Sequence, residues 1–322
     1  MPLDVVDKGI LVELYGNCRA TYRGIAKKLG LTATSVKKRV TLLREEGFLS
    51  RPYVLLSLAT MDADYCIAEV NTDGMEQDET FYDRIGAHPS VFIVLRIGPQ
   101  RIWVIGQVIG PVGLFDLGRF LRGLKSVEEV MINFMYPVSP TPLLSGSQYT
   151  YRGNKVTFTK PQLQVLRSLL DDARVSAIEI AKEINLSARR VRQVLQELIN
   201  GGGLYFTIFT KMSAGGVIPF NIVVDFDETK ASPHEITRWV MEHNPFEYWN
   251  TWLFANQPRL LHFCTAKDMQ TVDAITNKTK KAEFAKRVGS VIVRPQTFFV
   301  GLGHIRLAKL VGVDVANHRV EF

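Results

Sequence analysis

The fold is decided by the stretch from Asn17 to Val36, which reads NCRATYRGIAKKLGLTATSV. Shifting the chain by 155 positions aligns this stretch, without a gap, with the stretch from Asp172 to Val191, which reads DARVSAIEIAKEINLSARRV. A repeat of this length means that one structural unit occurs twice along the chain. Each motif of the first unit therefore has a counterpart in the second.

Three helices are predicted in the first copy. The first ends near Gly16, and its apolar residues recur at helical spacing, namely Val5, Val6, Ile10, Leu11 and Leu14. A second helix runs from about Thr21, which can cap it, to Leu29. Gly30 can take the left-handed conformation that ends a helix, and Thr32 can cap a third one. This order is typical of a helix-turn-helix motif.

The spacing of the third helix turns Val36, Val40 and Leu43 inward. Its outer face is small, hydroxylic or basic and carries Thr34, Ser35, Lys37, Lys38 and Arg39. Such side chains let a helix enter the major groove and bond to phosphates and base edges, so we expect these five residues to bind DNA. The apolar, β-rich segment 48–58 follows and suits a wing strand.

The second copy repeats this pattern. Helices are predicted near 159–170, 176–184 and 187–200, followed by a strand over 204–211. The outer face of its third helix carries Arg189, Arg190, Arg192 and Gln193. Arginine can reach guanine with two hydrogen bonds and glutamine can reach adenine, so these four residues are also expected to bind DNA.

The charge is distributed unevenly along the chain, which has a formal net charge of +7. Residues 1–52 hold 10 basic and 5 acidic side chains, whereas residues 60–137 hold 6 basic and 11 acidic ones. A basic first unit would face a phosphate backbone, and the acidic unit after it would be repelled. The expected partner is therefore double-stranded DNA.

The region after each helix-turn-helix has a β-α-β-β-α-β order, which describes a ferredoxin-like sandwich. In the first copy the pieces are 66–70, 79–87, 91–97, 102–109, 112–124 and 130–136. In the second copy they are about 217–226, 233–242, 247–255, 259–266, 268–280 and 288–298. The predicted fold class is thus α+β, a tandem repeat of a winged helix-turn-helix followed by a ferredoxin-like (βαββαβ) domain.

The domain boundaries follow from this order. Winged helix-turn-helix modules are expected over 1–58 and 158–212, and ferredoxin-like domains over 59–137 and 213–298. Proline, glycine, serine and threonine are frequent over 138–157, which is typical of a linker. The apolar extension 299–322 lies outside the repeat and either covers the second sheet or forms an oligomer contact.

The whole pattern resembles the Lrp/AsnC-type transcriptional regulators, with the unit doubled. The resemblance is strongest over Asn17–Gly47 and over Asp172–Ala181, and it extends to about residue 298. It implies a sequence-specific regulator of transcription whose ferredoxin-like domains pair through their sheets into a homodimer or higher homo-oligomer. It also implies that a small-molecule effector is bound.

One position departs from that family. Its members often have a Gly-x-x-Asp turn near the effector pocket, whereas here Arg101 and Arg259 stand where the aspartate is expected. An amino-acid effector bound in the usual way is therefore not expected. The two arginines either form surface salt bridges or contact an anionic ligand or a partner.

A competing enzyme interpretation comes from the siroheme decarboxylases, which the two-domain plan also resembles. His262, near Arg259 on a predicted strand, and the aromatic run from Phe246 to Trp252 would then belong to a tetrapyrrole pocket. Aromatic residues at alternating spacing in a strand are more often core or interface. His88-Pro89 leads into an ordinary buried strand, and basic recognition faces would serve no purpose in such an enzyme.

Other classes receive little support. The sequence contains no Walker loop, dinucleotide fingerprint, zinc-ligand pair or serine-type elbow, so no catalysis, metal or cofactor is expected. Three scattered cysteines, no apolar run long enough to span a membrane and no signal-peptide pattern indicate a cytoplasmic protein. Two alternatives remain: the helical modules are packing units with solvated basic faces, or they form a protein-interaction scaffold.

Overall fold

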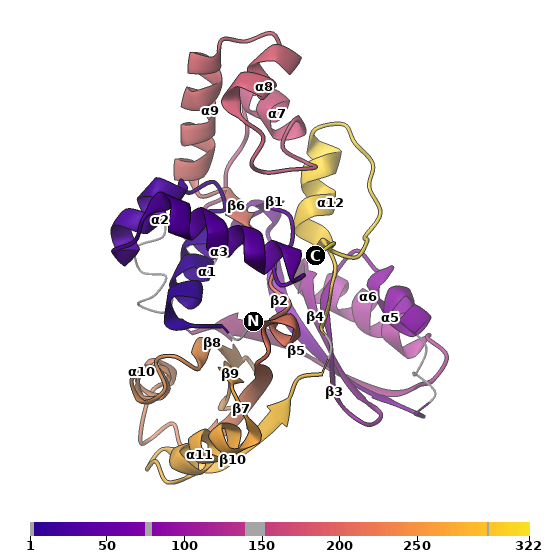
Figure 1. Cartoon of the computed structure of the whole chain (residues 1–322). Coiled ribbons are helices and arrows are strands. Elements are labelled where there is room, and N and C mark those ends of the chain that lie inside the picture. Colours follow the sequence, from indigo (N-terminus) through magenta and orange to yellow (C-terminus); the bar gives the residue numbers. More distant parts are fainter. Residues whose placement is uncertain (1–2, 75–78, 139–151, 295) are drawn as a thin grey trace.

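The computed structural model of the chain describes residues 3–74, 79–138, 152–294 and 296–322. Two winged helix modules and two ferredoxin-like domains follow one another in the predicted order, so the α+β tandem architecture is confirmed. In Figure 1 the second winged helix module lies at the top, the first at the left, and the second ferredoxin-like domain at the bottom.

The first winged helix module consists of α1 (Val5–Gly16), α2 (Tyr22–Leu29), α3 (Ala33–Glu45) and β1 (Tyr53–Leu56). Capping side chains define its helix starts. The Asp4 carboxylate accepts from the Asp7 N–H at 2.8 Å, and the Asp7 side chain accepts in turn from the Asp4 N–H. Gly30 ends α2 with φ +67°, the left-handed conformation that its position predicted.

The second winged helix module consists of α7 (Lys160–Arg167), α8 (Ala177–Glu183), α9 (Ala188–Gly201) and β6 (Leu204–Thr207). Its first helix is shorter than the predicted 159–170. The Leu169 and Leu170 N–H groups donate to carbonyls only three residues back, at 3.1 and 3.4 Å, so the helical pattern breaks there. Leu169 is nevertheless fully buried, which is why periodicity alone extended the helix too far.

The two wing strands pair with each other rather than within their own modules. β1 and β6 form a two-stranded antiparallel sheet with Tyr53 opposite Thr207 and Leu56 opposite Leu204. The predicted wing segment 48–58 is therefore correct in location but too long, since only Tyr53–Leu56 is a strand. A short helix, α4 (Leu58–Met61), follows β1, and a short 3-10 helix, η1 (Met212–Gly215), follows β6.

The first ferredoxin-like domain has a four-stranded antiparallel sheet in the order β5-β2-β4-β3. Its elements are β2 (Asp64–Thr72), α5 (Glu79–Gly86), β3 (Val91–Gly98), β4 (Arg101–Val108), α6 (Gly110–Arg122) and β5 (Val127–Pro137). One face of the sheet buries Cys66, Val94 and Val104 with helix residues such as Leu117. This core lies between the sheet and its two helices.

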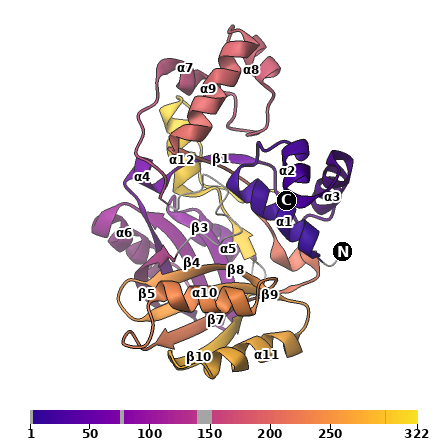
Figure 2. The same ribbon diagram turned by 90° about the vertical axis from the view of Figure 1, so that its left-hand side faces the viewer.

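The second ferredoxin-like domain repeats the topology in the order β10-β7-β9-β8. Its elements are β7 (Ile218–Phe226), α10 (Pro233–His243), β8 (Tyr248–Phe254), β9 (Arg259–Ala266), α11 (Met269–Lys280) and β10 (Ala285–Ile292). The helix-facing core contains Phe220, Val224, Tyr248 and Leu260. Figure 2 shows α10 and α11 on the outer side of this sheet.

The two ferredoxin-like sheets join edge to edge within one chain. Strand β5 pairs antiparallel with β8, with Met135 opposite Phe254 and Pro137 opposite Trp252, so the two four-stranded sheets form one continuous sheet of eight strands. The Val138 N–H extends this seam by donating to the Thr251 carbonyl at 3.0 Å. This edge pairing therefore joins two domains of the same chain.

The C-terminal region forms a second seam and corrects one predicted strand. The segment 288–298 was expected to be the last strand of the second sheet, but β10 ends at Ile292 and β11 (Gln296–Phe298) pairs with β3 of the first sheet. The Arg294 N–H also donates to the Arg96 carbonyl at 2.8 Å. The continuous sheet thus curls back on itself, and its two inner faces meet.

The extension 299–322 covers the first sheet, not the second. Helix α12 (Gly301–Leu310) packs near β1, and Phe299 enters the core of the first ferredoxin-like domain. The Asn317 side chain donates to the Gly86, His88 and Val91 carbonyls at 2.8–2.9 Å. The extension therefore holds the C-terminal end of the chain against the first ferredoxin-like domain.

The predicted linker 138–157 lies largely outside the described residues. Its described end is not free: Arg152 pairs with Asp64 at 2.5 Å and Lys155 with Asp62 at 2.6 Å. None of the helices among the described residues is both long and apolar enough to cross a membrane.

Candidate nucleic-acid interface

Helix α3 presents most of its predicted face to solvent. Its N-terminus is fixed by the Thr32 hydroxyl, which accepts from the Ser35 N–H at 3.1 Å. Val36, Val40 and Leu43 are buried as expected. The opposite face exposes Thr34, Lys37 and Lys38, and Ser35 is half-buried. Four of the five residues predicted to bind DNA on α3 are therefore accessible together.

Arg39, the fifth predicted residue, faces α1 instead. Its guanidinium contacts Asp4 at 2.8 Å and Asp7 at 2.7 Å. The hydrogen bond to Asp7, and then the one to Asp4, raises the pKa of Arg39. The 155-residue shift aligns Arg39 with Val194, which is fully buried in α9. Arg39 thus stands at a core-facing position of the helix and is engaged in an intramolecular ion pair.

Helix α9 is organised in the same way. The Ser187 hydroxyl caps it by accepting from the Arg190 N–H at 3.2 Å, and Val191, Val194, Leu195 and Leu198 are buried. Arg189, Arg192 and Gln193 are exposed and Arg190 is half-buried, so the four predicted residues lie on its accessible side.

Glu197 is a functional candidate that the sequence pattern alone did not single out. Its carboxylate accepts from Arg190 at 3.3 Å and from Gln193 at 3.1 Å. Spacings of four and seven residues place these side chains on one helix face, and this spacing was the signal that could have identified it. The exposed basic face of α9 therefore has an internal acidic partner, whereas α3 has Leu42 at the corresponding position.

Two arginines hold the winged helix modules against each other. Arg19 donates to the Ala173 carbonyl at 2.5 Å and to the Val175 carbonyl at 3.0 Å. Its repeat counterpart, Arg174, donates back to the Ala20 carbonyl at 3.4 Å. The repeat had revealed this matched pair, but its role as a clamp between the α3-bearing and α9-bearing modules emerges only from their contact.

Lys8 ties the first winged helix module to the second ferredoxin-like domain. Its ammonium donates to the Pro245, Phe246 and Tyr248 carbonyls at 3.0, 2.6 and 2.6 Å. Burial lowers its pKa to about 8. All three ammonium protons are used, so this side chain ties α1 firmly to the second ferredoxin-like domain.

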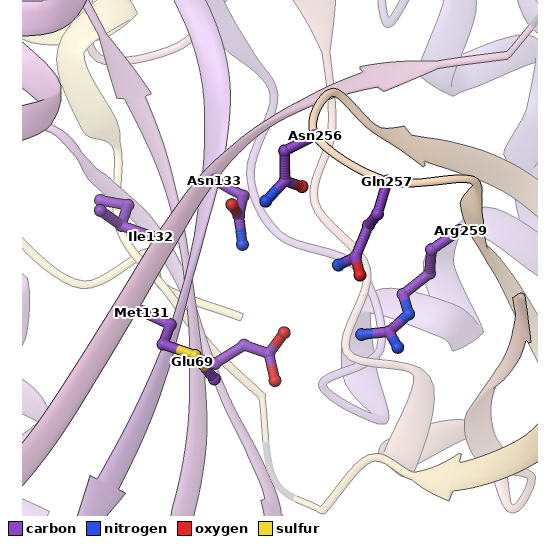
Figure 3. A pocket seen from close by; sticks show the side chains of 7 residues that line it. All are labelled: Glu69, Met131, Ile132, Asn133, Asn256, Gln257 and Arg259. Carbon is purple, nitrogen blue, oxygen red and sulfur yellow. The ribbon is translucent and has the colours of Figure 1, made fainter.

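The predicted arginines of the ferredoxin-like domains lie at an open end between the sheets. Figure 3 shows a cavity of about 430 Å³ in which Glu69 on β2 and Asn133 on β5 face Asn256, Gln257 and Arg259 of the other domain. A neighbouring cavity of about 300 Å³ shares Glu69 and Arg259. We refer to these two adjoining cavities as the polar mouth.

Arg101 and Arg259 both line the second of these cavities, so the structure brings them together. Arg259 is engaged by Asp225 at 2.6 Å, and Arg287 contacts the same carboxylate at 2.7 Å. The hydrogen bond to Asp225 raises the pKa of Arg259. Arg259 therefore forms the salt bridge that was one of its two expected roles, while Arg101 is exposed.

His262 lies on the opposite side of the sheet from Arg259. It is fully buried in the helix-facing core, where its Nδ1 is 2.7 Å from the Thr251 hydroxyl. Burial lowers its pKa to about 3. Residues three apart in a strand point to opposite faces, so His262 and Arg259 do not share the pocket that the competing enzyme interpretation requires. Trp252 lines the inner space, but Tyr248 belongs to the outer core.

Comparison with known proteins agrees with the duplicated arrangement. Residues 3–50 and 159–202 match the family described as winged helix-turn-helix DNA-binding. An HTH-type transcriptional regulator of Pyrococcus furiosus is 23% identical over 146 residues, which cover 44% of this chain and 98% of that relative. A second regulator of the same organism is 28% identical over 145 residues, covering 41% and 93%. These relatives are therefore about one unit long.

A solved structure shows the same fold at low identity. The siroheme decarboxylase NirDL in complex with an iron-uroporphyrin III analogue has a TM-score of 0.56 at 12% identity, covering 90% of this chain and 92% of that one. AsnC of Escherichia coli has a TM-score of 0.33 at 18% identity, covering 44% and 95%. Over most of its length the chain therefore shares the fold of NirDL, and a winged helix-turn-helix followed by a ferredoxin-like domain is present twice in one polypeptide.

Proposed function

We propose that this chain is a sequence-specific, DNA-binding regulator of transcription that uses two non-identical recognition helices. The observation that carries the proposal is the shared design of α3 and α9. Each is capped by a hydroxyl, anchored by buried aliphatic residues and exposed along a polar or basic face. A solvated packing unit does not require this combination in both copies, whereas entry into a major groove does.

The difference between the helices predicts an asymmetric site. Helix α3 offers Lys37 and Lys38, whereas α9 offers Arg192 and Gln193 at the aligned positions. Lysine mainly binds phosphate as a point charge, and Arg and Gln can read base edges with paired hydrogen bonds. One chain should therefore prefer two unlike half-sites.

The chain supplies both halves of a dimer-like unit by itself. Its two ferredoxin-like sheets already pair along β5 and β8, and its two wings pair along β1 and β6. We propose that a single chain is the DNA-binding unit. Association of whole chains into a homodimer or higher homo-oligomer, and control by a small effector at the polar mouth, remain predictions.

The experiment is selection from a random-sequence DNA pool, followed by salt titration on the selected and on a scrambled sequence. Selective binding by about 10³-fold or more would establish specific recognition. Replacing Lys37 and Lys38 by Ala should weaken binding to both sequences. It should also flatten the dependence on salt, by about one unit of slope for each phosphate that is no longer neutralised.

Lys278 and Lys280 on α11 provide the matched control, because this pair belongs to the outer helix of the second ferredoxin-like domain. Their replacement by Ala removes the same charge and should leave the salt slope unchanged. An equal slope change in both double variants would mean that overall charge, not the face of α3, binds DNA. Weak binding that ignores sequence would favour the scaffold interpretation.

A tetrapyrrole enzyme is the second candidate, because the NirDL likeness covers most of the chain. Against it, His262 faces the outer core, the aromatic cavity between the inner sheet faces has only about 140 Å³, and none of the described residues that line the larger polar mouth is a histidine. Ligand sites for larger molecules usually have about 300–1,000 Å³. We therefore propose a non-catalytic role. Absorption titration with an iron porphyrin distinguishes the two, since a saturable red-shifted Soret band would support the enzyme.

A further inference from the structure

A cavity of about 140 Å³ lies between the inner faces of the two ferredoxin-like sheets, beside the polar mouth, with which it shares Trp103 and Leu261. Aromatic rings form much of its wall, namely Tyr65, Phe92, Trp103, Trp252, Phe263 and Phe298. Aliphatic side chains of both domains fill the remainder, together with the amides of Asn221, Asn250 and Gln296. The wall thus combines flat apolar surfaces with a few polar groups.

The lining residues carry no formal charge, whereas carboxylates and guanidiniums line the polar mouth. Transfer of an ion into such surroundings without a counter-charge is strongly unfavourable. The cavity therefore selects against charged molecules. Its volume is close to the roughly 150 Å³ of an apolar protein cavity that holds benzene, so one six-membered ring is the appropriate size.

Two polar atoms of the wall lack partners among the described residues. The Trp103 indole Nε1 is a donor and the Gln296 Oε1 is an acceptor, and both atoms are buried. Trp103 is 4% exposed and Gln296 9% exposed. A buried polar group left without a hydrogen bond destabilises the protein. A molecule that offers one acceptor and one donor would satisfy both.

We propose that this cavity binds a small, uncharged aromatic molecule bearing an amide-like or phenol-like group. The ring fills the aromatic space, an oxygen of the polar group accepts from Trp103, and its hydrogen is donated to Gln296. The ligand differs in charge from an amino acid and in size from a tetrapyrrole. The proposed site adjoins the polar mouth at Trp103 but includes none of its charged residues.

The cavity also contacts both DNA-binding modules. Tyr15 of α1 lines it, and the Tyr15 hydroxyl is 2.5 Å from the hydroxyl of Thr210, a second lining residue that follows β6. The Thr207 hydroxyl on β6 donates to the Tyr15 carbonyl at 3.2 Å. Filling of the cavity is therefore coupled to the contact between α1 and β6, and this regulatory step rests on the proposed function.

The test uses benzamide as the probe and benzoate as its charged isostere, added to the full chain without DNA. Ligand-observed NMR and tryptophan fluorescence both measure binding. Benzamide should bind saturably, and benzoate should bind at least tenfold more weakly. The proposal would be overturned if the two probes bound equally well. It would also be overturned if benzamide showed no saturable binding at concentrations up to about 10 mM.

Variants locate the site. Gln296→Met keeps the side-chain length and removes the acceptor, and Trp103→Phe removes the donor. Each should weaken benzamide binding at least fivefold. Trp239→Phe is the control, because Trp239 stacks on His243 on the outer helix α10. A loss of affinity in the control as large as that in Gln296→Met would contradict the assigned site. If the Trp103→Phe variant does not fold, the affinity of the Gln296→Met variant for benzamide still tests the assigned site.

A second arm separates this proposal from the DNA-binding proposal. Benzamide binding is measured without DNA, so failure to bind DNA leaves that result interpretable. Where a selected DNA sequence is bound, saturating benzamide should change its Kd at least threefold, and DNA should change the benzamide Kd by the same factor. An unchanged DNA affinity would refute the coupling through Tyr15 while leaving the binding site itself supported.

Discussion

Arg39 occupies the position of α3 that corresponds to Val194 of α9, and its ion-pair partner Asp7 corresponds to Gln162. Asp7 is fully buried, while Arg39 keeps 29% of its side-chain surface exposed. The first module thus fixes α3 on α1 with a partly buried ion pair, whereas the second module has a buried valine and a glutamine at the aligned positions. Removing one member of such a pair leaves the other charge without compensation.

Arg39→Val should lower the free energy of unfolding by about 2 kcal/mol, less than the ~3–5 kcal/mol of a fully buried pair because Arg39 is partly exposed. The double variant Asp7→Gln with Arg39→Val reproduces the second module and should recover most of this loss. Urea unfolding measures both. If the double variant is as unstable as the sum of its single variants, Asp7 and Arg39 do not act as a pair.

His262 predicts how stability depends on pH. Its pKa is lowered from 6.5 to about 3 by burial, so between these values the unfolded chain binds a proton that the folded chain does not. The free energy of unfolding should therefore decrease as pH falls below 6.5, by at most ~1.4 kcal/mol per pH unit from this group.

In the first ferredoxin-like domain the position that corresponds to His262 is occupied by Val104. The variant His262→Val should therefore fit the strand, and it should reduce this dependence of stability on pH. The slope should not vanish, because burial also lowers the pKa of His304 to about 4. Denaturant unfolding between pH 4 and 7 measures the slopes. An identical slope in the variant and the parent chain would show that His262 does not titrate as its burial indicates.

At the level of elements, β11 and α12 decide how the molecule closes. Strand β11 covers the edge of β3, and Phe299 places its ring directly against Gly86, where a Cβ atom would lie 1.9 Å from the ring. Gly86 is therefore required for this close approach. An uncovered edge strand presents unpaired N–H and C=O groups that can pair with another chain.

A chain truncated after Arg294 should self-associate through the exposed β3 edge. Light scattering on size-separated protein should show a larger mass than that of the full chain at equal concentration. Phe299→Ala provides a milder change that keeps β11, and it should lower the free energy of unfolding by about 3–5 kcal/mol. If the truncated chain shows the monomer mass and the unfolding midpoint of the full chain, the segment after Arg294 does not protect this edge.

At the level of the whole molecule, three kinds of contact fix the two recognition helices relative to each other. The wings pair through β1 and β6, Arg19 and Arg174 clamp the modules, and Lys8 anchors α1 to the second ferredoxin-like domain. A rigid separation between recognition helices selects a single half-site spacing on DNA. The clamp should therefore control spacing rather than base preference.

Replacing Arg19 and Arg174 by Met should broaden the tolerated spacing. Binding is compared on selected sites with zero to five base pairs inserted between the half-sites. The parent chain should lose at least tenfold in affinity for most insertions, whereas the double variant should lose less at each of them. If both proteins show the same spacing profile, the clamp does not set the separation.

The local elements could be predicted because their signals are local. Gly30 and the Thr32 cap defined the turn before α3, and alternating apolar residues defined the strands of both sandwiches. The errors arose where tertiary contacts decide. The predicted strand 288–298 divides because its second part pairs with the first domain, and α7 ends early although its buried leucines continue the helical spacing.

The sequence by itself determined the duplication, the order of elements, the helix caps and the exposed basic faces of α3 and α9, because these depend on spacing and on single residue types. The tertiary structure alone decided that the sheets pair within one chain, that Arg39 forms an ion pair with Asp7 of α1 and that an uncharged cavity forms between the sheets. These features join residues more than 30 positions apart, and one hydrophobic pattern is compatible with several such pairings. Only packing of the whole chain selects among them.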